Sequence, residues 1–129
     1  MIPDWAGYCG FRDAFAGVMD ERYYTLDWLD SQVLWSKVQF FCTDDAAIIV
    51  EIKDYPTGAK DVHGLIAAGD LADIIEVLIP QAEAWGKERG CIAGLIESRP
   101  GWAKTLKGFG YEPHQLTIRK ELTDGPIKE

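Results

Sequence analysis

The chain has no run of apolar residues long enough to cross a bilayer. Its first residues, MIPDWAGYCGF, contain neither the basic segment nor the apolar stretch that a secretory signal needs. It also contains no internal repeat and no low-complexity segment. We therefore expect an ordered protein that has no membrane partner and is located in the cytoplasm.

Cysteine and histidine are scarce. The three cysteines, Cys9, Cys42 and Cys91, are odd in number and form no Cys-x-x-Cys pair, and His63 and His114 stand alone. This pattern predicts neither a disulfide framework nor a metal site. Because the cysteines lie in or beside apolar runs such as FFC and CIAGLI, we expect them to be small buried hydrophobic residues.

The chain has few basic residues: 13, compared with 21 acidic ones, which gives a formal net charge of −8. Non-specific binding to nucleic acid depends on lysine and arginine neutralising phosphates, so we expect no nucleic-acid partner. Basic residues outnumber acidic ones only between residues 87 and 120, which places the acidic excess in the N-terminal part.

The chain has 129 residues, of which 47% are hydrophobic. This is enough to bury the core of one domain. We expect a single domain over residues 1–129, with 123–129 as a flexible tail. The spacing of apolar residues predicts a helix over 11–21 and a second helix that begins at Thr25, a suitable N-cap. Strands are expected over 37–43, 46–54 and about 62–67, and the short connections DD and YPTGAK make them an antiparallel meander.

A long amphipathic helix follows, starting near Leu71. Pro80 falls within its apolar pattern and should kink or divide it, and Gly90 is expected to end it. A fourth strand is predicted over 91–98, parallel to the third because a crossover helix joins them. The stretch WAKTLKGFG predicts a short helix, and the alternating stretch 114–122 predicts a closing strand.

This order, ααβββαβαβ, resembles that of the GNAT superfamily, the acetyl-CoA-dependent N-acetyltransferases. The C-terminal segment ESRPGWAKTLKGFGYEPHQLTIRKEL is also similar to the family's last helix, Gly-aromatic turn and closing strand. The resemblance implies an α/β (α+β) fold in which a mixed central sheet, with a meander and a βαβ crossover, has helices on both faces.

The resemblance also implies a cofactor loop before the long helix, where family members have an Arg/Gln-x-x-Gly-x-Gly/Ala turn for the pyrophosphate. Here the turn is AAGD, so the corresponding cofactor-binding positions are Ala67, Ala68, Gly69 and Asp70. The turn is short, has one glycine and lacks the basic or amide residue. Because Asp70 is placed to cap the helix itself, with Asp73 at the third helical position, we expect no bound cofactor; acetyl-CoA is the cofactor if the protein is active.

The family's general acid is often a tyrosine before the Gly-aromatic turn, and Lys107 occupies that position here. Tyr111, inside the turn, is the replacement candidate implied by the resemblance.

A general base must lie in the cleft and accept a proton from the substrate amine. Glu51 and Glu97, on or at the ends of central strands, are the candidate bases, and Asp54 and Asp61 are further carboxylates beside them. His63 could serve in the same role, although a lone strand histidine is more often a hydrogen-bonded structural residue.

Two functions follow from these residues. One is a GNAT-fold protein without efficient acetyl-CoA catalysis that binds a protein partner, as a phage or prophage component that could be associated with the virion and its structural proteins. The stretch DERYYTLDWLDSQ, with Tyr23, Tyr24 and Trp28 among carboxylates, suits such an interface. The alternative is an acetyl-CoA-dependent N-acetyltransferase of an unknown amine.

Overall fold

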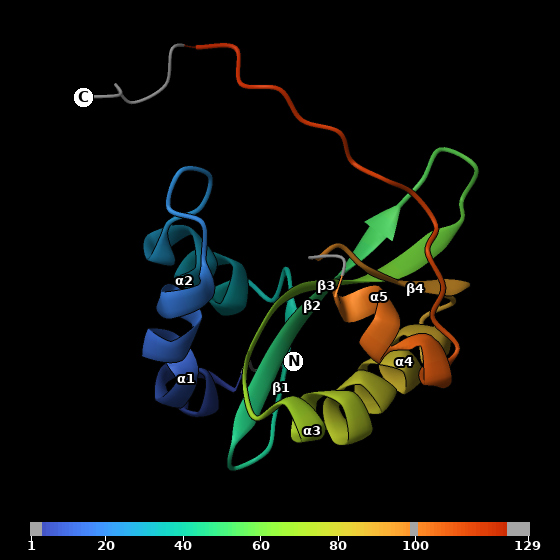
Figure 1. Ribbon diagram of the computed structural model, residues 1–129. Coiled ribbons are helices and arrows are strands. Elements are labelled where there is room, and N and C mark those ends of the chain that lie inside the picture. The colour runs from blue at the N-terminus through green and yellow to red at the C-terminus, as the bar shows by residue number, and fades with distance from the viewer. Residues whose placement is uncertain (1–3, 99–100, 124–129) are drawn as a thin grey trace. The chain divides into compact units, whose positions relative to one another are not determined.

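The computed structural model describes residues 4–98 and 101–123, which form parts of two compact units, residues 1–97 and 98–129. The first unit contains α1 (Trp5–Val18), α2 (Leu26–Leu34), β1 (Gln39–Cys42), β2 (Ala46–Asp54), β3 (Lys60–Gly69), α3 (Leu71–Asp73), η1 (Ile74–Leu78), α4 (Ile79–Glu88) and β4 (Ala93–Ile96) (Figure 1). The second unit contains α5 (Gly101–Thr105) and η2 (Lys107–Phe109). The single domain expected over residues 1–129 stays a prediction, and the expected tail lies, from residue 124 on, outside the described residues.

The sheet is mixed and runs in the order β1-β2-β3-β4. β1 pairs with β2 and β2 with β3 in antiparallel register, while β3 and β4 are parallel. The meander and the crossover predicted from the sequence are confirmed, and so is the fold class, a mixed α/β protein. The second strand begins and ends at the predicted residues, 46 and 54.

The closing strand predicted over 114–122 is wrong, because residues 112–122 have no regular secondary structure. Three of its apolar side chains are almost fully exposed: Leu116 at 82%, Ile118 at 87% and Leu122 at 90%. Alternation specifies which face of a strand is apolar, but a strand is stable only when it also has a hydrogen-bonding neighbour and an apolar cover. This segment has neither within the described part of the chain, so the sheet has four strands.

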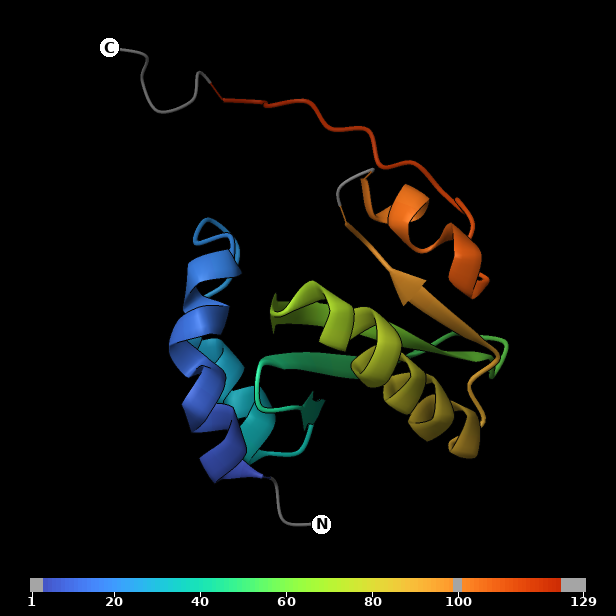
Figure 2. The same cartoon turned by 60° about the horizontal axis from the view of Figure 1, so that its bottom comes forward.

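Helices cover both faces of the sheet (Figure 2). Successive residues of a strand point to opposite faces. On one face α1 and α2 pack over the sheet and form a core of Tyr8, Phe15, Leu29, Val33, Ala47, Ile49 and Ala68. On the other face η1 and α4 contact β2 and β3 and bury Ile74, Ile75, Leu78 and Ala82.

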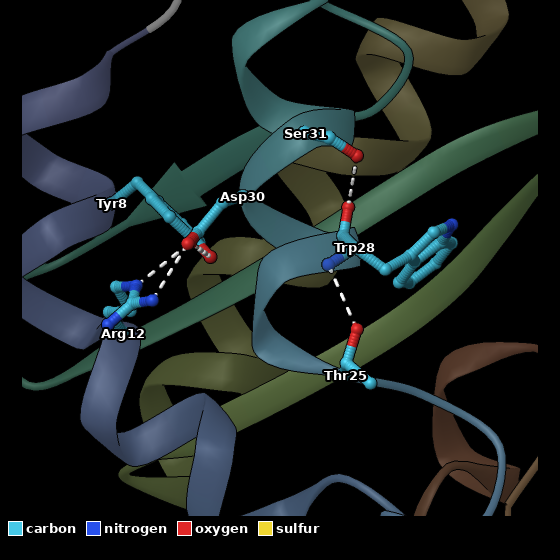
Figure 3. Close-up of polar contacts among 6 residues, drawn as sticks. All are labelled: Tyr8, Arg12, Thr25, Trp28, Asp30 and Ser31. Atoms are coloured by element: carbon cyan, nitrogen blue, oxygen red, sulfur yellow. Dashed lines mark hydrogen bonds and ion pairs between the residues drawn. The ribbon is translucent and has the colours of Figure 1, made fainter.

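The first helix begins at Trp5, before the predicted start at residue 11, because Asp4 caps it by accepting the backbone N–H of Gly7 at 3.0 Å. The Thr25 cap of α2 is confirmed, with its hydroxyl accepting the N–H of Trp28 at 3.1 Å (Figure 3). Both helices therefore start at a side-chain oxygen that satisfies an otherwise unpaired amide.

One polar contact joins α1 to α2. Asp30 accepts two hydrogen bonds from the Arg12 guanidinium, at 2.8 and 2.7 Å, and one from the Tyr8 hydroxyl at 2.7 Å (Figure 3). The bonds from Arg12 lower the pKa of Asp30, while burial and the bond to Asp30 raise the pKa of Tyr8. This contact fixes the two helices against each other above the aromatic core.

The long helix divides, as Pro80 predicts. One widened turn, η1, lies directly before α4, where the Ile79 N–H donates to the Ile74 carbonyl, and Pro80 sits in the first turn of α4. A proline has no N–H and crowds the carbonyl four residues back, and a single wide turn accommodates both effects. Gly90 follows the helix with φ +86°, which confirms the predicted end.

The expectation of buried cysteines is wrong for two of the three. Cys9 is exposed on α1 and Cys42 is exposed at the end of the edge strand β1, whereas Cys91 is partly buried. Apolar neighbours in sequence do not bury a residue whose side chain points away from the core. None of the three forms a disulfide.

Candidate functional site

The third and fourth strands separate part-way along their length. β4 pairs with β3 only from Asp61↔Ala93 to Gly64↔Ile96, and β3 then continues to Gly69 with β2 alone. At the point of separation the register shifts, since Val50 pairs with Gly64 and Ile49 with Ile66, leaving Leu65 as a bulge. Beyond this bulge one edge of β3 has no strand partner among the described residues.

The four predicted cofactor-loop residues lie at the end of that edge. Ala67 is partly buried, and Ala68 is 5% exposed and belongs to the core under α1 and α2. Gly69 has φ +106°, and its Cα lies so close to the next strand that an added Cβ would be 2.3 Å from the Asp45 carbonyl oxygen. Gly69 thus serves a tight strand-to-helix turn, a sufficient reason for glycine at this position.

Asp70 occupies the beginning of the helix, as its sequence position predicts. Its Oδ2 accepts the Asp73 N–H at 3.0 Å, and its own N–H donates to the Asp45 carbonyl at 2.9 Å. The side chain of Asp73, at the third helical position, accepts the Thr43 hydroxyl through Oδ2 at 2.6 Å. The turn is therefore tied on both sides to the β1–β2 connection.

A pyrophosphate needs unpaired backbone amides and a surrounding without negative charge. Here the amides of Asp70 and Asp73 are already bonded within the protein, and two carboxylates lie within one helical turn. The residues of this turn do not fit the pyrophosphate of acetyl-CoA.

A separate polar cluster is formed by residues of β2 and β3 and by the residue that follows β4. His63, 7% exposed, has Nδ1 2.8 Å from Glu51 Oε2 and Nε2 2.7 Å from Glu97 Oε1. The contact with Glu97 is close but lacks the alignment of a hydrogen bond. We call Glu51, His63 and Glu97 the acid-base cluster.

The hydrogen bond between His63 and Glu51 fixes which ring nitrogen carries the proton. A carboxylate oxygen only accepts, so the contact of 2.8 Å with Glu51 places the N–H of His63 on Nδ1. Glu97 is the accessible member, with 65% of its side chain exposed, and Lys53 Nζ lies 3.5 Å from its Oε1. Because His63 Nε2 is itself buried behind Glu97, proton exchange between this imidazole and solvent or a substrate amine requires the exposed Glu97 side chain to move aside.

Beside the acid-base cluster, the Tyr55 hydroxyl donates to Asp61 Oδ2 at 2.9 Å. This hydrogen bond is the main reason that the pKa of Tyr55 is raised, so Tyr55 stays a neutral donor. Since Glu51 pairs with His63 and Lys53 with Asp61 across the strands, these ionisable side chains share one face.

Of the predicted catalytic residues, the structure brings Glu51 and Glu97 together through His63. Tyr111 belongs to the second unit, where it is partly buried and its N–H donates to the Leu106 carbonyl at 3.4 Å. Its catalytic role stays a prediction. The role of His63 as the bridge was missed, although the meander's register, which places residue 63 opposite residue 51, could have indicated it.

The aromatic stretch between α1 and α2 is on the surface. Tyr23 is 56% exposed and Tyr24 45% exposed, and the Tyr24 ring lies 5.1 Å from that of the partly buried Trp28. Within the described residues no group of histidine, cysteine and acidic side chains could hold a metal ion, and no helix there is long and apolar enough to span a membrane.

No family model and no curated protein matches the sequence. The fold, in contrast, has clear counterparts. An acetyltransferase from Trypanosoma brucei superimposes with a TM-score of 0.68 at 12% identity, covering 95% of this chain and 97% of the other. Glucosamine-6-phosphate N-acetyltransferase from Arabidopsis thaliana gives 0.64 at 12% identity, covering 88% and 90%.

An aminoglycoside N-acetyltransferase in complex with CoA gives a TM-score of 0.62 at 14% identity, covering 89% of this chain and 91% of the other. At such identities the likeness shows the fold alone. The chain therefore has the fold of the GNAT acetyltransferases, and its chemistry must be argued from its own residues.

Proposed function

We propose that this chain is a GNAT-fold protein that does not carry out efficient acetyl-CoA catalysis and acts instead by binding a protein partner. The observation that carries the proposal is the Asp70 cap. Its carboxylate lies 3.0 Å from the Asp73 N–H, at the helix end where acetyl-CoA phosphates would need free amides.

The electrostatic repulsion expected between these carboxylates and a phosphate is larger than the attraction expected from the helix end. Two like charges about 4 Å apart near a protein surface repel by about 4 kcal/mol before salt screening. An anion at a helix N-terminus gains only about 0.3 to 2 kcal/mol. With Asp70 and Asp73 both within the first turn, repulsion exceeds the attraction of the helix end.

The exposed aromatic residues support a protein partner. Tyr23 and Tyr24 are solvent-exposed in a chain whose formal charge is −8. Exposed tyrosine and tryptophan are typical centres of protein interfaces, whereas the negative charge disfavours nucleic acid and anionic membranes. The further proposal of a phage component, in the cytoplasm or on the virion, is supported only by the resemblance of its shortened cofactor loop to such proteins.

The expected result of a thermal-shift experiment is that 1 mM acetyl-CoA leaves the melting temperature of the protein unchanged. A ligand present at 100 times its Kd would add about 2.7 kcal/mol to the stability of the folded state, which corresponds to several degrees for a domain of this size. Sodium pyrophosphate at the same concentration is the control for ionic effects. A clear rise in the melting temperature with acetyl-CoA, but not with pyrophosphate, would contradict the proposal.

A second candidate function, an acetyl-CoA-dependent N-acetyltransferase of an unknown amine, is favoured by the acid-base cluster. His63 stands at the separation of β3 and β4, held by Glu51 at 2.8 Å. A rotation of the exposed Glu97 side chain would leave Nε2 open to accept a proton. This candidate requires the chain to hold the cofactor without the phosphate-binding turn.

A further inference from the structure

The strand β1 has a neighbour on one side only. It pairs with β2, and no other strand of the described residues lies beside it (Figure 2). Its four residues, QFFC, include no charge and no proline, and its register with β2 is unbroken. Charges, prolines and bulges are the features by which exposed sheet edges usually avoid pairing with another chain. We call the outer side of Gln39–Cys42 the β1 edge.

The register with β2 shows which backbone groups the β1 edge offers. The Thr43 N–H donates to the Ala46 carbonyl at 2.8 Å, so these two residues form a hydrogen-bonded pair. Such pairs alternate with non-hydrogen-bonded pairs along an antiparallel ladder. Phe41 therefore bonds to β2, whereas Phe40 and Cys42 direct their N–H and carbonyl groups away from it. The β1 edge thus offers the donors and acceptors of two residues.

These groups are complementary to those of a second β1 edge in antiparallel orientation. When Phe41 lies opposite Phe41 of a second copy, Phe40 of each copy pairs with Cys42 of the other. All the outward donors and acceptors of both strands are then bonded. The two Phe41 rings also form a cross-strand aromatic pair, which stabilises a sheet.

The charges at the two ends of the β1 edge are opposite. Lys37 lies before the strand and Asp44 and Asp45 lie after it, and all three residues are exposed. Within the described part of the chain none of them forms an ion pair. Antiparallel pairing brings Lys37 of each copy beside the two aspartates of the other, whereas parallel pairing would bring like charges together. Charge complementarity therefore favours a second copy in antiparallel orientation.

Two exposed apolar side chains precede the β1 edge in the chain. Leu34, the last residue of α2, is 53% exposed, and Trp35 is 76% exposed. An exposed tryptophan is typical of protein interfaces. These side chains add apolar area beside a strand of four residues, whose backbone bonds alone would form only a weak contact.

We propose that the β1 edge is an interface between two copies of this chain, which join their four-stranded sheets across a two-fold axis. The same surface of each copy takes part, so the contact closes at a dimer. This inference goes beyond the proposed function, because it concerns a second copy of the chain and depends neither on the cofactor nor on a different protein partner.

The test is sedimentation velocity of the full chain at concentrations from about 5 to about 500 μM. A reducing buffer prevents disulfide formation by the exposed Cys42. We expect the sedimentation coefficient to rise from that of a monomer to that of a dimer, because a short strand contact dissociates on dilution. A monomer at every concentration, or assembly that continues beyond the dimer, would overturn the proposal.

Cys42→Pro tests the backbone contact. Proline removes an outward N–H of the β1 edge and no hydrogen bond to β2, so dimerisation should weaken at least tenfold. Cys42→Ser is the matched control, because it keeps the N–H, and it should change the dimer dissociation constant less than twofold. Dimerisation of Cys42→Pro as strong as that of the wild type would place the interface elsewhere and overturn the proposal.

Lys37→Glu tests the charges without altering the strand, and so decides the matter even when Cys42→Pro does not fold. At low salt it should weaken dimerisation at least tenfold, because glutamate then lies beside Asp44 and Asp45 of the other copy. Combining Lys37→Glu with Asp45→Lys should restore the dissociation constant to within threefold of the wild type. Equal dimerisation of Lys37→Glu and wild type would contradict the antiparallel contact. Melting temperatures report whether each variant is folded.

Discussion

Replacing Gly69 by alanine is expected to lower the free energy of unfolding by about 3 kcal/mol or more. Gly69 has φ +106°, a backbone conformation that costs a residue with a side chain about 1 to 3 kcal/mol. The new Cβ would also lie 2.3 Å from the Asp45 carbonyl oxygen and 2.6 Å from the Ala46 Cα. Both are backbone atoms that cannot rotate away, so the turn itself must move. Urea denaturation gives the free energy.

Gly58→Ala is the matched control for that change. Gly58 has a similar φ of +91°, but nothing lies within 4 Å of the position its Cβ would take. Gly58→Ala should therefore lower the free energy of unfolding only by the cost of the positive φ, about 1 kcal/mol. Equal losses for Gly58→Ala and Gly69→Ala would show that the close approach of the strand-to-helix turn to β2 is not real. The structural role of Gly69 would then need another explanation.

The second large effect is expected at Asp30. Removing its carboxylate in Asp30→Ala leaves the fully buried Tyr8 without its acceptor and Arg12 without its partner. Loss of a fully buried pair costs about 3 to 5 kcal/mol, but Arg12 is 34% exposed and can be solvated, so we expect about 2 to 3 kcal/mol. Asp20→Ala, which removes an exposed pair with Arg22, should cost less than about 1 kcal/mol. Similar losses for the two variants would contradict the α1–α2 contact.

The Asp30 contribution should depend on pH in a defined way. Because the pKa of Asp30 is lowered in the folded protein, its contribution is present above the ordinary aspartate pKa and is lost as pH falls through the folded pKa. Because the pKa of Tyr8 is raised, its contribution is present below the ordinary tyrosine pKa and is lost at higher pH. The stability difference between wild type and Asp30→Ala should thus be largest between about pH 5 and 9. A difference that grows toward acid pH would contradict this.

Local signals account for most of the correct fold predictions. β2 was placed to the residue because AAIIVEIKD is rich in β-branched residues and is bounded by turns on both sides. The Thr25 and Asp70 caps were found because a cap is a contact over three residues. The closing strand failed because pairing is a long-range property, and residues 114–122 carry the alternation without a described neighbour to pair with.

In the candidate site, too, the local features could be predicted from the sequence and the long-range contacts could not. The sequence AAGD predicts that the Asp70 carboxylate caps the helix. The contact between Asp73 and Thr43 spans 30 residues and depends on the position of the β1–β2 connection, so the sequence did not indicate it. Glu51 and Glu97 were candidates because of their strand positions, yet their meeting at His63 requires the register of three strands.

Calorimetric titration of acetyl-CoA into the wild-type protein is the decisive measurement, with Asp70→Asn alongside it. The asparagine keeps an oxygen able to cap the Asp73 N–H but removes the charge, so a gain in its affinity reports the repulsion alone. We expect no saturable heat for the wild type up to about 1 mM and a measurable affinity for Asp70→Asn. A micromolar Kd for the wild type would show that Asp70 does not exclude the cofactor and that the chain binds it as an enzyme would.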